Sequence, residues 1–188
     1  MDYNAVYSMA FSQSEYSNDH HIQYDYVIEK LKQIYNTNDI FELIDIGSGR
    51  GQLIALLQQN FKNINITSVD LKKNHNISVS FITCNLSKHD DRMNLLNKTY
   101  DVLVCTDVLE HLDKSFINEV ITLFSKLSSK SILAIANHSD VLNGIELHTI
   151  QENNVWWENI LLKVYNIKEY DTKYNNRLLL YTLDSNIA

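Results

Sequence analysis

Three of the four glycines in this 188-residue chain stand at alternate positions, Gly47, Gly49 and Gly51. A chain this sparing with glycine places it where the backbone turns tightly or lets another group come close. A short apolar run that contains one aspartate, Leu-Ile-Asp-Ile, precedes the glycines, and a helical pattern begins at Leu53. We therefore expect a strand-to-helix turn at the carboxyl edge of a parallel sheet, where open α/β sheets bind nucleotide-like ligands.

The spacing of these glycines narrows the kind of ligand. The dinucleotide fingerprint G-x-G-x-x-G would place its third glycine at position 52, which is Gln52 here. The order Asp45-x-Gly-x-Gly-x-Gly instead resembles motif I of the class I S-adenosylmethionine-dependent methyltransferases. The resemblance implies that the turn passes under the methionyl-ribose part of the cofactor, in space that a Cβ at Gly47 or Gly49 would fill. It also implies that Asp45 helps to hold the cationic amino end through a charge-assisted hydrogen bond.

A second segment resembles the same family. The apolar run over 100–106 predicts a buried, central strand, and it leads into Asp107-Val-Leu-Glu-His-Leu. Many class I methyltransferases end their fourth strand in a run of this kind. The resemblance implies that strands one and four lie side by side at the switch point of the sheet. Asp107 would then face the glycine turn, near the methionyl end of the cofactor.

Two further strand ends complete the expected cofactor site. The strand predicted over 63–70 ends on Asp70, 70 − 47 = 23 residues after the first glycine of the turn. A carboxylate at that distance suits both hydroxyls of a ribose, and a surface aspartate is the alternative. After the strand predicted over 77–84, Asn85 stands where relatives often carry an Asp for the adenine amino group, and a turn asparagine is the alternative. The full cofactor-binding set that the resemblance implies is Asp45, Gly47, Ser48, Gly49, Gly51, Asp70, Leu71, Asn85, Leu86 and Asp107.

Histidines are the candidate catalytic residues. An oxygen nucleophile needs a base, and His111, His138 and His148 follow the strands predicted over 100–106 and 131–136. A loop histidine bonded to backbone is the alternative for the last two. Asp107, Glu110 and His111 could also share one helical face. Some relatives bind a divalent metal with such residues, others use the histidine as a base, and many do neither, so we assign no metal ligands.

The amino-acid composition limits the kinds of partner that this protein is expected to bind. A formal net charge of −7 and the lack of a Lys/Arg cluster argue against a nucleic-acid-binding surface. Cys84 and Cys105 lie in apolar runs, as buried free thiols do. No run approaches the roughly 20 apolar residues of a membrane span, and the N-terminus lacks a basic-then-apolar signal. We therefore expect a cytoplasmic protein that acts on a small molecule, without membrane or nucleic acid.

Periodicity predicts the elements that position these residues. Helical patterns cover 22–35, 50–61, 114–129 and 151–165, with at most a short helix over 88–98. Strand patterns cover 41–46, 63–70, 77–84, 100–106, 131–136, 167–171 and 177–183. The expected fold is α/β, a three-layer α-β-α sandwich around a seven-stranded, mostly parallel sheet with an antiparallel last strand. One domain over 22–188 would follow an N-terminal lid or tail over 1–21.

The predicted reaction is transfer of the methyl group of S-adenosylmethionine to an O or N atom of a small hydroxylated metabolite such as a sugar. The loop over 137–151 and the first twenty residues are expected to hold this substrate. Trp156 and Trp157 are about 100° apart on a helix, so one faces inward and the other lines the substrate mouth or a homodimer contact. The alternatives are a non-catalytic cofactor-binding or scaffold protein with this fold, and a nicotinamide oxidoreductase, which Gln52 disfavours.

Overall fold

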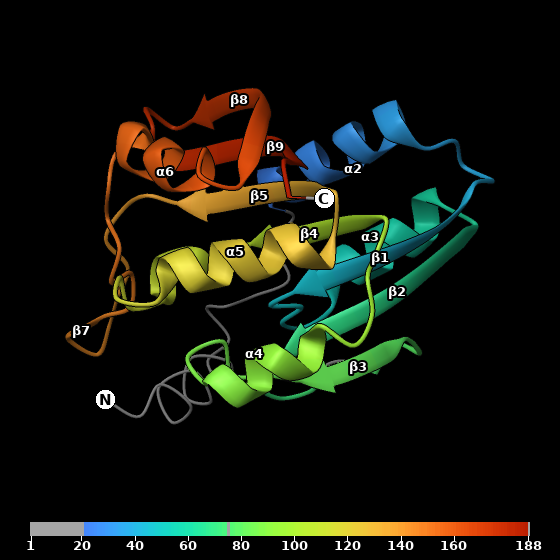
Figure 1. The fold of residues 1–188 in the computed structure, drawn as a ribbon, viewed down its shortest axis with the longest axis horizontal. Helices are drawn as coiled ribbons and strands as arrows, with labels where there is room; N and C mark the ends of the chain where they lie inside the picture. The colour runs from blue at the N-terminus through green and yellow to red at the C-terminus, as the bar shows by residue number, and fades with distance from the viewer. Residues whose placement is uncertain (1–20, 75, 188) are drawn as a thin grey trace.

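A seven-stranded sheet forms the centre of the protein, in the order β3-β2-β1-β4-β5-β9-β8 (Figure 1). The computed structural model describes residues 21–74 and 76–187, so nearly all of the expected N-terminal lid or tail lies outside the described residues. The strands are β1 (Ile40–Ile46), β2 (Asn63–Asp70), β3 (Ser80–Thr83), β4 (Val102–Thr106), β5 (Lys130–Ala136), β8 (Tyr165–Lys173) and β9 (Leu178–Ser185). Strands β3, β2, β1, β4 and β5 pair in parallel, whereas β9 pairs antiparallel with both β5 and β8. The predicted sheet with its antiparallel last strand is confirmed.

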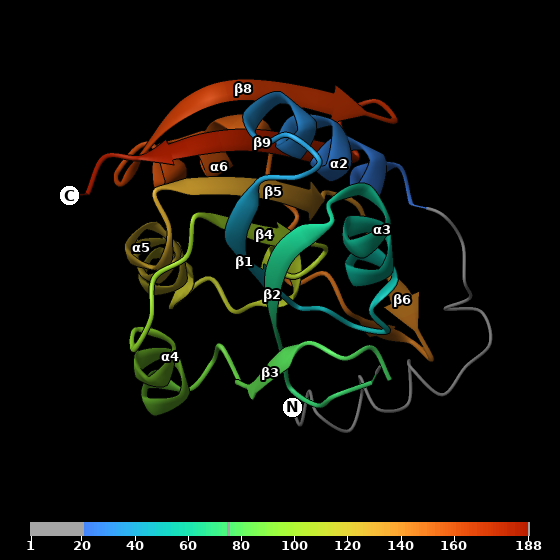
Figure 2. The same cartoon turned by 90° about the vertical axis from the view of Figure 1, so that its right-hand side faces the viewer.

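Helices cover both faces of the sheet (Figure 2). One layer consists of α2 (Ile22–Ile34) and α3 (Gln52–Asn60), which pack into one apolar cluster. The other layer consists of α4 (His89–Leu95), α5 (Ile117–Leu127) and α6 (Asn154–Leu161), which contribute to a second cluster on the opposite face. The predicted three-layer α-β-α sandwich is therefore confirmed. No helix within the described residues is long and apolar enough to cross a membrane.

Strand β4 shows why the sheet is buried on both sides. Val102 and Val104 pack into the cluster beneath α2 and α3, whereas Leu103 and Cys105 pack into the cluster beneath α5 and α6. Successive side chains of a strand point to opposite faces, so an unbroken apolar run supplies both clusters at once. This places the carboxyl end of β4 at the centre of the sheet, beside the carboxyl end of β1.

The predicted ends of two elements were wrong. Strand β3 covers Ser80–Thr83, half of the predicted range, because this strand lies at the edge of the sheet. The helix predicted over 151–165 ends at Leu161, and Tyr165 instead begins β8. The Tyr165 hydroxyl lies 2.9 Å from Ser131 Oγ on β5, a buried polar contact that helical periodicity does not reveal.

The segment over 137–151 contains a short hairpin, β6 (Val141–Leu142) and β7 (Ile145–Glu146). Asn143 and Gly144 form its turn, both with positive φ, 51° and 77°. An Asn-Gly pair is the strongest short-range hairpin signal, and the sequence analysis overlooked it. The hairpin folds the chain back, so that residues after it return to the carboxyl edge of the sheet.

The tryptophan pair divides as expected. Trp157 is fully buried beneath α6, whereas Trp156 is half-buried and meets it edge-on, with ring centroids 5.0 Å apart. Lys114 Nζ lies 5.6 Å from the centroid of the Trp156 ring. The prediction that one tryptophan faces inward is confirmed, and a role for Trp156 at a substrate mouth or dimer contact stays a prediction.

Candidate active site

The glycine turn is tied to the end of β2. The backbone N–H of Gly47 donates to the carbonyl of Val69 at 2.7 Å, and that of Gly49 donates to Asp70 Oδ2 at 2.8 Å. The other oxygen of this carboxylate accepts from the backbone N–H of Leu71 at 2.6 Å. The acidic residue and the turn, predicted separately from the sequence, thus form one hydrogen-bonded unit.

Gly47 also lies against the segment that follows β4. Its φ is 80°, and a Cβ added to it would lie 2.1 Å from Cγ2 of Val108. A Cβ at this position was predicted to occupy space that the cofactor needs. The structure instead shows that the nearest obstacle is the Val108 side chain. Gly51, with φ 79°, then provides the N-cap of α3.

Asp45 is buried at the end of β1, with 1% of its surface exposed. Its Oδ2 atom has no hydrogen-bond partner among the described residues, and neither does the hydroxyl of the buried Ser48. Burial, and then the nearby charge of Asp70, raise the pKa of Asp45 from its ordinary 3.8 to about 7. An ionised carboxylate in this position is unfavourable until a cation or a donor compensates it.

Asp107 ends β4 with a left-handed backbone, φ 54°. The side-chain amide of Gln23, in the first turn of α2, donates to Asp107 Oδ2. Half-buried Tyr24 lies in the same turn, and burial, then the charges of Asp107 and Asp45, raise its pKa. The first turn of α2 therefore closes one side of the space between β1 and β4. The sequence analysis missed Gln23 and Tyr24 because periodicity assigned them only to a helix.

The segment after β3 matches its predicted role less closely. Asn85 Oδ1 accepts from the backbone N–H of Ser87 at 2.9 Å, which is a local turn contact. Leu86 is 7% exposed and belongs to the core beneath α5. These contacts correspond to the turn alternative, and the adenine contact proposed for this segment stays a prediction.

The three predicted catalytic histidines gather beyond the ends of β4 and β5. The His148 ring centroid lies 4.7 Å from that of His111 and 5.0 Å from that of His138. Burial raises the pKa of Asp107, the residue that follows β4, whereas charges at His148 and His138 act to lower it. The structure therefore brings together histidines that the sequence analysis treated one by one.

The loop that carries His148 is organised by Glu146. Its Oε1 accepts from the backbone N–H groups of Asp140 and His148, each at 2.9 Å. Its Oε2 accepts from the hydroxyl of Ser139 at 2.5 Å. These contacts, led by the Ser139 hydroxyl, lower the pKa of Glu146 to about 2, so the carboxylate that orders the loop is ionised.

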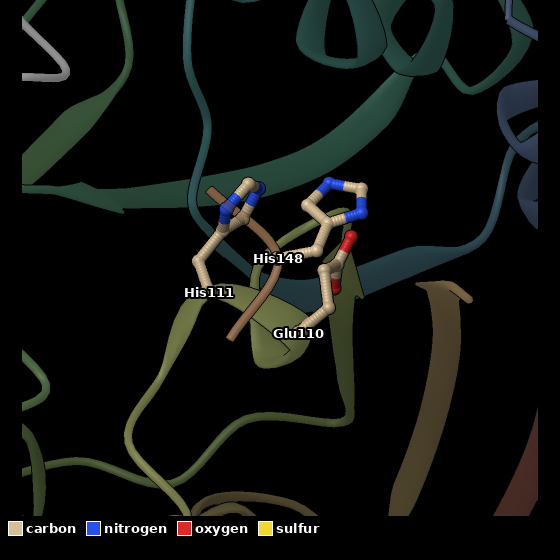
Figure 3. A group of neighbouring side chains, drawn as sticks. All are labelled: Glu110, His111 and His148. Carbon is tan, nitrogen blue, oxygen red and sulfur yellow. The ribbon is translucent and has the colours of Figure 1, made fainter. Parts of the chain in front are cut away.

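Glu110 and His111 lie in η1 (Leu109–His111), a single turn of 3-10 helix after β4. Burial is the main reason that the pKa of Glu110 is raised and that of His111 is lowered to about 4. Figure 3 shows the Glu110 carboxylate pointing toward the His148 ring, with the His111 ring beside it. The predicted shared helical face with Asp107 was wrong, because the left-handed Asp107 lies outside the turn.

Comparison with known proteins shows which family this chain resembles along most of its length. A family model described as a methyltransferase domain matches residues 19–172. A ubiquinone biosynthesis O-methyltransferase of Rickettsia typhi is 33% identical over 103 residues, which cover 50% of this chain and 39% of that protein. The Rickettsia bellii protein of the same name is 29% identical over 122 residues, covering 61% of this chain and 49% of that protein. The chain thus matches less than half of the length of these relatives.

Solved structures share the fold at low sequence identity. A magnesium protoporphyrin IX methyltransferase from Synechocystis, with S-adenosylhomocysteine bound, aligns with a TM-score of 0.71 at 17% identity, covering 98% of this chain and 97% of that one. The 1,6-didemethyltoxoflavin-N1-methyltransferase of Burkholderia thailandensis aligns with a TM-score of 0.69 at 14% identity, covering 98% and 89%. Because the family model covers most of the chain, and the sheet and the glycine turn have the form that motif I predicts, the protein belongs to the methyltransferase-domain family with the class I fold.

Proposed function

We propose that this protein transfers the methyl group of S-adenosylmethionine to an oxygen atom of a small hydroxylated molecule. The observation that carries the proposal is the buried Asp45 carboxylate at the glycine turn, whose Oδ2 atom has no hydrogen-bond partner among the described residues. The cofactor, when bound, supplies a methyl group already activated on a cationic sulfonium. A catalyst of this reaction therefore mainly positions the two reactants.

The residues around the turn fit such a ligand. Asp45 would accept from its ammonium group, which compensates a carboxylate that is otherwise costly to ionise. The unpartnered hydroxyl of Ser48 offers a further polar contact beside it. Asp70, held at the glycine turn through Gly49, would accept from the ribose hydroxyls. Asp107, held by Gln23, would close the methionyl side.

An oxygen acceptor is favoured by two observations. A hydroxyl must lose a proton when it attacks, and His138 and His148, whose charges act on Asp107, offer rings that could receive such a proton. The curated relatives are named as O-methyltransferases of ubiquinone biosynthesis, which favours a phenolic hydroxyl over the sugar hydroxyl suggested by the sequence. We propose a phenol or catechol as the acceptor class.

Calorimetric titration and an acceptor panel test this function. We expect S-adenosylhomocysteine to bind with one site per chain and NAD not to bind. We then expect methyl transfer from labelled S-adenosylmethionine to phenols and catechols, but not to sugars or amines. Binding of NAD alone would exclude the methyltransferase proposal. Tight binding of S-adenosylhomocysteine without transfer to any acceptor would favour the non-catalytic alternative.

The contact between Gln23 and Asp107 gives a specific prediction. Gln23→Ala removes a hydrogen bond to a carboxylate, a contact worth about 1.5–3 kcal/mol, so we expect S-adenosylhomocysteine to bind about tenfold more weakly. Gln33→Ala is the matched control, because this exposed glutamine of α2 contacts only Glu29, at 3.3 Å, in the contacts described. Calorimetry measures the affinity of both variants for S-adenosylhomocysteine. Equal affinities in Gln23→Ala and Gln33→Ala would contradict a positioning role for Gln23.

Two expectations about the protein as a whole also stay proposals. We expect a cytoplasmic location and a homodimer in which half-buried Trp156 lies near the contact. Fractionation of cells expressing the protein tests the first. Light scattering during size-exclusion chromatography tests the second, and a monomer at all concentrations would contradict it.

A further inference from the structure

Glu110, His111 and His148 form a compact group of possible metal ligands. His148 lies 148 − 111 = 37 residues after His111, and the β6–β7 hairpin brings it back to the turn after β4. One ligand atom from each of the three residues lies within 4.8 Å of the other two (Figure 3). Ligand atoms around a Zn²⁺ at about 2.1 Å are at most about 4 Å apart, so roughly an ångström of closure would complete the group.

Glu110 supplies an independent indication that a ligand belongs here. Its side chain is fully buried. Oε1 accepts from the backbone N–H of Ala136 at 3.2 Å, whereas Oε2 has no hydrogen-bond partner among the described residues. Buried polar atoms are nearly always paired, and buried carboxylates commonly pair with a cation or coordinate a metal. The Glu110 carboxylate points toward the His148 ring (Figure 3).

The two imidazoles are oriented as metal-binding imidazoles usually are. Nδ1 of His111 lies 3.0 Å from the carbonyl of Leu147, and Nδ1 of His148 lies 2.6 Å from the carbonyl of His138. A carbonyl oxygen only accepts, so each neutral ring carries its proton on Nδ1 and its lone pair on Nε2. Backbone carbonyls fix the ligating nitrogen of metal-site histidines in this way.

We propose that Glu110, His111 and His148 bind a divalent first-row transition-metal ion that holds the acceptor oxygen. Two imidazoles favour Zn²⁺, Mn²⁺, Fe²⁺ or Co²⁺ over Mg²⁺ and Ca²⁺, which prefer oxygen ligands. Three protein ligands leave a coordination position for another molecule. Asp140 Oδ2, 3.9 Å from His148 Nε2, adds negative charge beside the ion.

The acceptor part of this inference rests on the proposed function. An oxygen bound to a metal would lose its proton more readily, here to His138, the one histidine of the group that is not a ligand. The oxygen then forms a bond to the methyl carbon while the carbon–sulfur bond breaks, and that electron pair stays on sulfur. Because η1 begins two residues after Asp107, its ligands Glu110 and His111 would place the bound oxygen at the methionyl end of the cofactor site.

Titration with Co²⁺ tests the site without the cofactor. Untagged protein is treated with a chelator, and Co²⁺ is added while visible absorption and thermal unfolding are followed. We expect one Co²⁺ per chain, visible d–d bands, a higher Tm, and displacement by Zn²⁺. The absence of saturable binding up to millimolar Co²⁺ would overturn the proposal.

Three variants locate the bound ion. Glu110→Gln, which keeps the side-chain shape, and His148→Ala are expected to weaken Co²⁺ binding at least tenfold. His138→Ala is the matched control, because it removes a neighbouring ring, 5.0 Å from that of His148 between centroids, that is outside the ligand group, and it keeps the backbone carbonyl that contacts His148 Nδ1. Binding that persists unchanged in both Glu110→Gln and His148→Ala would place the ion elsewhere and overturn the assignment. Circular dichroism of each variant shows whether it folds, and Glu110→Gln serves if His148→Ala does not.

Chelation separates the two proposals. We expect the chelator to abolish methyl transfer while S-adenosylhomocysteine still binds, and Zn²⁺ or Mn²⁺ to restore transfer. Transfer that is unaffected by complete removal of the metal would overturn the acceptor-holding role. A protein that binds Co²⁺ but not S-adenosylhomocysteine would instead contradict the methyltransferase proposal and leave the metal site supported.

Discussion

Replacing Asp45 by asparagine is expected to weaken S-adenosylhomocysteine binding by roughly 10- to 100-fold. The same change is expected to stabilise the ligand-free protein at pH 8. Both effects have one cause, because Asp45 is 1% exposed and its Oδ2 has no partner among the described residues. Under the proposed function the carboxylate accepts from the cationic end of the cofactor, and without a ligand its ionised form destabilises the fold.

The pH dependence follows from the direction of the pKa shift. Burial raises the pKa of Asp45 from 3.8 to about 7, so the folded protein holds a proton that the unfolded chain has lost. Its contribution to stability is full below about pH 4 and is lost as the pH rises toward 7. One pKa unit corresponds to about 1.4 kcal/mol, so the loss at pH 8 is at most about 4 kcal/mol.

Urea unfolding at pH 5 and pH 8 measures this effect. We expect the difference between Asp45→Asn and the wild type to be smaller at pH 5, where the unfolded chain is already ionised at this position but the folded carboxyl is still mostly neutral. At pH 8 we expect the variant to be more stable by about 1–3 kcal/mol, since an unpaired amide is still buried there. An Asp45→Asn protein that is less stable than the wild type at pH 8 would show that the carboxylate is compensated in the ligand-free protein.

Gly47→Ala should destabilise the fold by about 2–4 kcal/mol and abolish cofactor binding. Alanine at φ 80° is strained, and its Cβ would lie 2.1 Å from Val108 Cγ2. Val108 is branched at Cβ and directly follows Asp107, so it cannot yield without disturbing the end of β4. The substitution therefore affects both sides of the cofactor site.

Two further variants separate strain from collision. Gly144→Ala is the matched control, because Gly144 has a similar φ of 77° and, within residues 21–74 and 76–187, no neighbouring atom within 4 Å of an added Cβ. We expect it to cost only about 1 kcal/mol in urea unfolding. Val108→Ala in the Gly47→Ala background should restore part of the lost stability. Equal losses in the two single glycine variants, without rescue by Val108→Ala, would contradict the steric explanation.

Sequence patterns placed the glycine turn and Asp70 together correctly because this geometry is local. Gly47 and Gly49 lie in one turn, and Asp70 ends the neighbouring strand, so spacing alone brings them together. The contact of Gly47 with Val108 could not be predicted, since it depends on how two strand ends pack. Gln23 was missed for a similar reason, because an amphipathic pattern gives the buried face of a helix but not which strand its first turn meets.

The grouping of the histidines depends on contacts between residues that are far apart in the sequence. His148 joins His111 only because the Asn143–Gly144 turn reverses the chain, and the sequence analysis treated that region as a loop without structure. The predicted ends of helices and strands were wrong where turn residues are scarce. The chain has no proline and only one glycine outside the cofactor turn, so nothing in the sequence marks the change from α6 to Tyr165 in β8.

The place of β9 in the sheet determines how long the edge of β5 stays unpaired during synthesis. β9 pairs with the whole of β5, yet Leu178 begins it 178 − 136 = 42 residues after Ala136 ends that strand. During synthesis at about 5–20 residues per second, β5 would remain an open edge for roughly 2–8 s. Exposed strand edges recruit other chains. A nascent chain paused between β5 and β9 therefore exposes a strand edge in the middle of the future sheet, which other chains can pair with until β9 is made.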